Sequence, residues 1–83
     1  MTGTELRACL TEILVAEQRP HVDWPAVEKL CMDTIERLNT ETAPDYPYDT
    51  VYHFLDDPDV RQKDDGYARV QRQRLREWLE TAA

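Results

Sequence analysis

Several residue types and patterns are rare or missing in this 83-residue chain, and each gap excludes a class of chemistry. The chain has no serine, which rules out a serine catalytic triad. Its two glycines are too few for a glycine-rich loop that binds phosphate. The longest strictly apolar run covers residues 13–16, far short of the ~20 residues that a membrane-spanning helix needs. We therefore expect no enzyme activity and no membrane span.

Metal and thiol chemistry also lack a sequence signature. His21 and His53 are 32 positions apart, and neither stands at a zinc-ligand spacing from a cysteine. Cys9 and Cys31 are 22 positions apart and fall in apolar helical stripes, a placement typical of buried free thiols. A disulfide between the two helices is the alternative. We expect no catalytic residue, no metal ligand and no cofactor.

The charge balance of the chain is strongly acidic. Seventeen Asp and Glu residues oppose ten Lys and Arg residues, which gives a net charge of −7. This charge disfavours direct binding to nucleic acid and to anionic membranes. Residues 1–59 carry 13 acids and four bases, whereas residues 60–83 carry four acids and six bases. Residues 1–5 lack the basic and apolar regions of a signal peptide, and we expect a cytoplasmic location.

Apolar spacing and capping signals predict the first two helices. Over residues 5–18, apolar side chains recur at i, i+3, i+4 and i+7, behind a capping box of Thr2 and Glu5. Asp23 and Pro25 mark the start of a second helix, whose apolar stripe continues to residue 38. Residues 40–50 contain two prolines and several turn-forming side chains, so a loop is expected there.

The rest of the chain predicts a short helix followed by a longer one. Asp49 is expected to cap a helix over residues 51–56, and Asp57-Pro58 to restart the chain. Gly66 permits a kink or a second start before the last helix ends near residue 81. The inward residues of that helix are expected to be Tyr67, Val70, Leu75, Trp78 and Leu79.

No stretch of useful length shows the alternation of a β-strand. Short connections favour antiparallel packing of the first two helices, while the longer loop leaves the third helix free to cross. The sequence therefore predicts an all-α fold, a small irregular bundle of four helices of which the third is short. Residues 1–83 form a single helical domain in this interpretation.

A dense cluster of tyrosine and aspartate surrounds the predicted short helix. Tyrosine offers a large contact area at low entropic cost, and aspartate is a strong acceptor for lysine and arginine. We interpret the cluster as a binding face for a basic protein surface. Turn formation, with the tyrosines packing the loop onto the bundle, is the alternative. The candidate partner-binding residues are Asp45, Tyr46, Tyr48, Asp49, Tyr52, Asp56, Asp57 and Asp59.

The last helix offers a second candidate surface. Arg69, Arg72 and Arg76 stand at i, i+3 and i+7, so they form a basic stripe on one helix face. Such a stripe can bind a phosphate backbone. The overall acidity instead favours a solvated face that balances acidic neighbours within the bundle.

Residues 23–79 resemble, in their layout, the immunity proteins that neutralise nuclease bacteriocins. The shared features are length, acidity, a short third helix flanked by Asp and Tyr, and a last helix that ends in Arg76-Glu77-Trp78. The chain departs from that family after residue 48, because Asp-Thr-Val-Tyr-His-Phe stands in place of the family's Tyr-Tyr-Pro signature. The resemblance implies a nuclease as the partner.

These features together predict a small acidic protein-binding module. Its expected role is that of an inhibitor, immunity-like or antitoxin-like partner of a basic protein that handles nucleic acid, because opposite charge speeds association. An alternative is a structural helical subunit that forms a homodimer through an uncovered apolar face. A further alternative is nucleic-acid contact through the basic stripe, with a steep dependence on salt.

Overall fold

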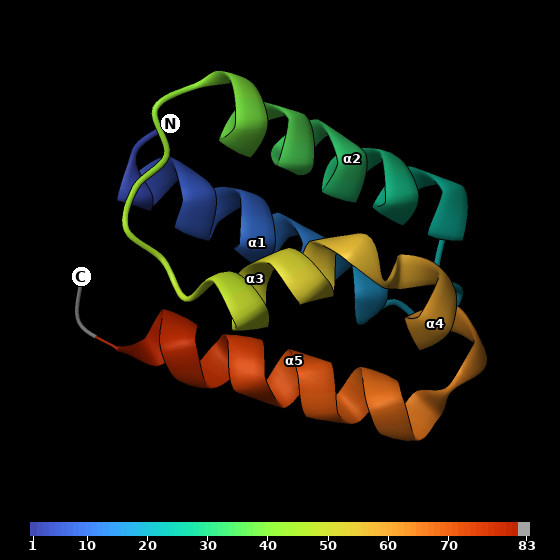
Figure 1. Cartoon of the computed structure of the whole chain (residues 1–83). Coiled ribbons are helices and arrows are strands. Elements are labelled where there is room, and N and C mark those ends of the chain that lie inside the picture. The colour runs from blue at the N-terminus through green and yellow to red at the C-terminus, as the bar shows by residue number, and fades with distance from the viewer. Residues whose placement is uncertain (82–83) are drawn as a thin grey trace.

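Five α-helices make up most of the part of the chain that the computed structural model describes, residues 1–81 (Figure 1). The described residues are 78% helical and contain no strand, which confirms the predicted all-α bundle. The described residues contain one helix more than predicted, because the last predicted helix is divided into two. The helices are α1 (Gly3–Glu17), α2 (Trp24–Thr40), α3 (Tyr48–Asp56), α4 (Pro58–Lys63) and α5 (Asp65–Glu80).

The predicted starts of the first two helices are confirmed. The Glu5 backbone N–H donates to the Thr2 hydroxyl, and the Thr2 backbone N–H donates to the Glu5 carboxylate, which completes the capping box of α1. The Asp23 carboxylate accepts from the Ala26 backbone N–H at the start of α2, where Pro25 lies in the first turn. Local signals therefore determine both starts.

The prediction that Asp49 caps the short helix is wrong. Helix α3 begins at Tyr48, and its N-cap residue is Pro47, whose side chain makes no capping hydrogen bond. Proline has a backbone φ angle close to the helical value, so the helix follows it directly. Asp49 lies instead in the first turn, where its negative charge interacts favourably with the helix dipole.

The second start near Gly66 is real, and Asp64 produces it. Asp64 has an extended backbone, and its carboxylate accepts from the Tyr67 backbone N–H at the start of α5. Gly66 lies inside α5, and no described residue has a positive φ angle. The predicted inward positions of Tyr67 and Val70 are wrong, since 38% and 49% of their surfaces are exposed. Leu75 is fully buried, as predicted, and Ala68, seven residues before it on the same face of α5, is buried as well.

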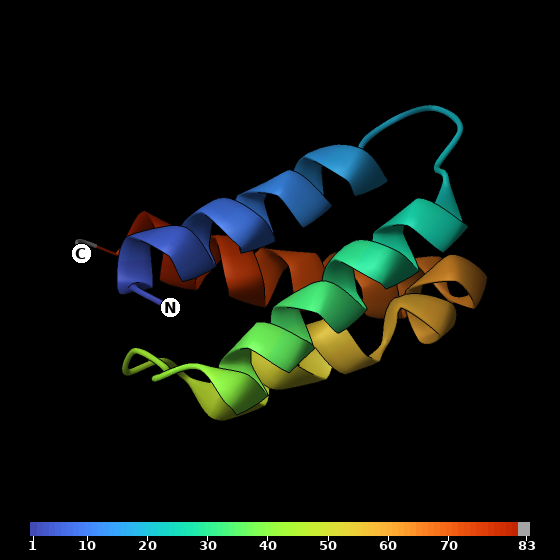
Figure 2. The same ribbon diagram turned by 90° about the horizontal axis from the view of Figure 1, so that it is seen from above.

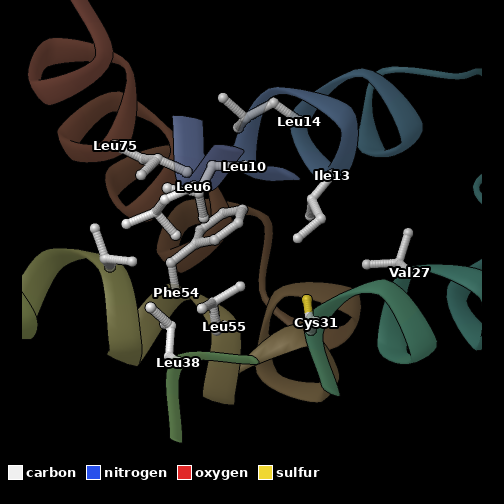
Figure 3. Close-up of a cluster of buried hydrophobic side chains, with 11 residues drawn as sticks. Leu6, Leu10, Ile13, Leu14, Val27, Cys31, Leu38, Phe54, Leu55 and Leu75 are labelled. Carbon is white, nitrogen blue, oxygen red and sulfur yellow. The ribbon is translucent and has the colours of Figure 1, made fainter. Parts of the chain in front are cut away.

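The helices pack around a single apolar core. Helices α1 and α2 lie side by side and antiparallel, and α3 runs antiparallel to α2 on its other side (Figures 1 and 2). Helix α5 packs against α3 and α4. In Figure 3, Phe54 points from α3 toward Leu6 and Leu10 of α1. The buried cluster consists of Leu6, Leu10, Ile13, Leu14, Val27, Cys31, Leu38, Val51, Phe54, Leu55 and Leu75.

Polar contacts hold α1 against the end of α5. The Arg7 guanidinium donates to the carbonyls of Trp78 and Leu79, at 3.4 and 3.1 Å from Nη1. These carbonyls belong to the last turn of α5, which has no basic residue of its own. The same guanidinium lies 4.3 Å from the centre of the Trp78 ring, so a cation–π contact strengthens the attachment.

Candidate protein-binding surface

Three tyrosines form a stacked row at the start of α3. The loop after α2 contributes Tyr46, and the first two turns of the helix contribute Tyr48 and Tyr52. The rings of Tyr48 and Tyr52 are 4.8 Å apart and nearly parallel, at 11°. Those of Tyr46 and Tyr48 are 6.3 Å apart at 28°. Because α3 starts at Tyr48, Tyr48 and Tyr52 stand at i and i+4 on one helix face. We call these three residues the tyrosine row.

Exposure differs along the tyrosine row. Tyr48 exposes 56% of its surface, whereas Tyr46 and Tyr52 are half-buried. Tyr46 also packs against the core cluster, and burial raises the pKa of its phenol above the usual value of 10. The row therefore combines a ring fixed to the bundle with one presented to solvent. Such rigid aromatic surface suits a binding anchor, because little side-chain entropy remains to be lost.

The structure separates the aspartates that were predicted to surround these tyrosines. Asp45, Asp49, Asp56 and Asp59 are all exposed. Asp49 lines a groove between α3 and α5, together with Arg74. Asp56 and Asp59 line a different groove, between α2 and the junction of α3 with α4. The predicted cluster thus spreads over more than one face of the bundle.

Asp57 serves an internal role. Its carboxylate oxygen Oδ2 accepts from the Tyr67 hydroxyl at 2.6 Å and from the Gln71 amide at 3.0 Å. The hydrogen bond to Asp57 is the main reason that the pKa of the Tyr67 phenol is raised. Asp57 occupies the N-cap position of α4 without a side-chain capping bond, so its carboxylate is free to tie α5 to the α3–α4 junction. The residue is half-buried.

The basic stripe on α5 is partly engaged within the bundle. Arg69 is exposed and Arg76 is half-buried. Arg72 donates to the Glu17 carboxylate of α1, with its Nη2 2.9 Å from Oε1. A stripe whose central arginine is bonded to a buried carboxylate presents less charge to a phosphate backbone. This geometry agrees with the interpretation of the stripe as a face that balances acidic neighbours.

A buried ion pair between Glu17 and Arg61 lies behind that contact. Neither side chain has exposed surface, and Arg61 Nε is 3.0 Å from Glu17 Oε1. Arg61 also donates to the Phe54 carbonyl and to the Gln71 side chain, and its guanidinium lies 3.8 Å from the centre of the Phe54 ring. Among residues 1–81, no buried side-chain nitrogen or oxygen lacks a hydrogen-bond partner.

The sequence pattern did not lead to this ion pair, although a signal was present. Glu17 follows Ile13 and Leu14 at the next inward position of α1. Arg61 stands seven residues after Phe54 and is the most voluminous of the fully buried side chains. A charged residue at an inward position on each of two helices, with opposite signs, indicates a buried pair.

Both cysteines are free thiols in the described part of the chain. Cys31 is fully buried, and burial raises the pKa of its thiol to about 11. Cys9 is half-buried, with Arg37 Nη1 3.9 Å from its sulfur. The predicted free state is thus confirmed, and the two thiols differ in their access to solvent.

Comparisons with models of protein families, with curated proteins and with solved structures found no match for this chain. Within residues 1–81, no group of three or more His, Cys, Asp or Glu side chains is arranged to hold a metal ion. No helix in that part of the chain has both the length and the apolar character needed to cross a membrane. The functional interpretation therefore rests on the surface features of the bundle.

Proposed function

We propose that this protein is a small acidic binding module that acts as an inhibitor, immunity-like or antitoxin-like partner of a basic protein that handles nucleic acid. The tyrosine row carries this proposal. Its outermost ring, Tyr48, is 56% exposed and stacks at 4.8 Å on Tyr52, so a contact surface is held in place before binding. Exposed Asp45 and Asp59 add acceptors for lysine and arginine.

The net charge of −7 supports a basic partner. An acidic domain gains association rate from a basic surface and is repelled by nucleic acid. Proteins that handle nucleic acid carry such basic surfaces. Inhibition then requires only that the bound module covers the partner's basic cleft. The module itself contributes contact and no chemistry.

A pull-down from the native host tests the proposal. The tagged protein is compared with Tyr48→Ala/Tyr52→Ala and, as a matched control, with Arg69→Ala/Arg76→Ala. The control spares Arg72, because Arg72 is bonded to the buried Glu17. Thermal unfolding of each variant checks that the bundle persists. We expect the wild type and the arginine variant to capture the same basic protein and the tyrosine variant to lose it. If the arginine variant alone failed to capture the partner, the basic stripe would be the binding surface.

A further inference from the structure

A shallow groove with an apolar floor runs between α2 and the α3–α4 junction. Met32 and Ile35 of α2 face Leu55 and Pro58 across it. A second hollow along α2 shares Met32 and Ile35 and extends to Asn39, in the last turns of the helix. Because α3 runs antiparallel to α2, its first turns lie near this end of α2 (Figures 1 and 2). We call the surface formed by Met32, Ile35, Leu55 and Pro58 the α2–α3 groove.

The tyrosine row and the α2–α3 groove follow the same side of α3. Tyr48, Tyr52 and Leu55 stand at i, i+4 and i+7, so they share one face of the helix. Leu55 is fully packed, while Met32 exposes 68% of its surface, more than any other large apolar side chain described. Methionine is flexible and polarizable, and it adapts to the shape of a bound partner.

The rim of the groove is acidic and lacks basic residues. Glu28, Asp56 and Asp59 line the groove, and Glu36 lines its extension. All four are exposed, and none forms an ion pair within residues 1–81. No lysine or arginine lines either hollow. Lys29, on the same helix, is already paired with Asp33 at 3.1 Å.

This combination of an apolar floor and an acidic rim selects one kind of occupant. A second copy of the chain in a symmetric contact would place the same acidic rim against itself, which opposes dimerisation through this face. A basic segment carries a charge opposite in sign to that of the rim. We infer that the α2–α3 groove receives a helical segment of the basic partner, with an apolar side chain on Met32 and lysines or arginines against the rim. The inference rests on the proposed function and extends its binding face onto α2.

Methyl NMR gives a direct readout, because the chain has only two methionines. Met32 is exposed, whereas Met1 is half-buried and packs against the core. The protein, labelled at the methionine methyl carbons, is titrated with a synthetic amphipathic helix of leucine and lysine, about 18 residues or five turns long. Two control peptides replace either lysine with glutamate or leucine with glutamine.

We expect the leucine–lysine peptide to shift the Met32 signal much more than the Met1 signal, and the leucine–glutamate peptide to leave both unchanged. Met32→Glu should weaken peptide binding at least about tenfold. The matched control is Val15→Glu, because Val15 is a 53% exposed aliphatic residue in a groove that contains Arg19. It should change the affinity less than about twofold.

Four outcomes would overturn the inference. The first is an unchanged Met32 signal. The second is equal binding of the lysine–glutamine peptide, which would mean that charge alone drives association. The third is a Met32 signal that depends on protein concentration without peptide, with dimers seen in sedimentation. The fourth is a host partner that still binds the Met32→Glu variant but no longer binds the Tyr48→Ala/Tyr52→Ala variant. That result would refute the role of the α2–α3 groove and leave the proposed function standing.

Discussion

The guanidinium of Arg61 and the carboxylate of Glu17 form an ion pair inside the bundle, with 3.0 Å between Nε and Oε1 and neither side chain exposed. The pair joins the end of α1 to α4, and Arg72 adds α5 to the same carboxylate. Taking two charges out of water is costly, and the attraction within the pair together with the further hydrogen bonds of Arg61, to the Phe54 carbonyl and to Gln71, offsets that cost. The bundle therefore depends on both partners being present.

Removal of one partner should strongly destabilise the protein. Glu17→Ala leaves the Arg61 charge buried without its partner, and such changes cost about 3–5 kcal/mol. This is a large part of the ~5–15 kcal/mol that stabilises a typical domain. Urea unfolding followed by circular dichroism measures the effect. Asp33→Ala is the control, because it breaks an exposed pair with Lys29 and should cost under about 1 kcal/mol.

Removal of both charges should be milder than removal of one. Glu17→Met/Arg61→Met keeps much of the buried volume and leaves no unpaired charge from the pair itself. We expect the double variant to unfold at a higher urea concentration than Glu17→Ala. Equal or lower stability of the double variant would show that the other contacts of Arg61, to the Phe54 carbonyl and to Gln71, matter more than the charge balance.

The two thiols should react at different rates. Burial raises the pKa of Cys31 to about 11, so its thiol is protonated and shielded at neutral pH, whereas Cys9 is half-buried. A chromogenic disulfide reagent should label one thiol per native chain quickly and the second only after unfolding in urea. Cys9→Ala should abolish the fast phase. A fast phase that survives in Cys9→Ala would contradict the burial of Cys31.

Glu5 should make stability depend on pH in the acid range. The Thr2 backbone N–H and the Arg37 guanidinium both donate to its carboxylate, and they lower its pKa from 4.5 to about 2. A carboxyl whose pKa is lower in the folded state stabilises the fold above its unfolded pKa. That contribution is lost as the pH falls from about 4.5 to about 2. Acid therefore weakens the capping region of α1.

Thermal melts of wild type and Glu5→Gln across this range check the prediction. Glutamine keeps an acceptor for the Thr2 N–H and removes the charge that faces Arg37. The difference in melting temperature should be largest above pH ~4.5 and should shrink toward pH ~2. If the difference in melting temperature stayed constant over the whole pH range, the stabilising effect of Glu5 would come from hydrogen bonding alone.

Local signals in the sequence predict much of the fold. Thr2 and Asp23 begin their helices as expected, because capping depends on residues three positions away. The errors concern where a helix starts and which residues share its inward face. Asp49 does not cap α3, which begins at Tyr48. Tyr67 and Val70 do not lie on the face of α5 that Leu75 buries.

The candidate site was less accessible to sequence reasoning. The stacking of Tyr46, Tyr48 and Tyr52 follows from the start of α3 at Tyr48, which a residue pattern places only approximately. The exposure of Met32 depends on how far α3 covers α2, which is a tertiary property. Arg61 was overlooked, because helical periodicity assigns charged residues to the surface unless a partner is known.

Acidic residues on the rim of the α2–α3 groove should affect the rate of association with the partner. Asp59 is exposed and lies at the edge of the α2–α3 groove. Asp59→Asn should slow association with the captured partner and leave dissociation nearly unchanged, because a rim charge acts mainly through long-range attraction. The difference from wild type should fade as salt is added. A change confined to dissociation would place Asp59 in direct contact.

The dissociation kinetics of the captured host partner test the central claim most directly. Tyr48→Ala removes the most exposed ring of the tyrosine row and should weaken binding by on the order of 2 kcal/mol, about 30-fold, mainly through faster dissociation. Arg69→Ala/Arg76→Ala should stay within about twofold of wild type. Wild-type affinity in Tyr48→Ala, together with weakened binding in the arginine variant, would contradict the account.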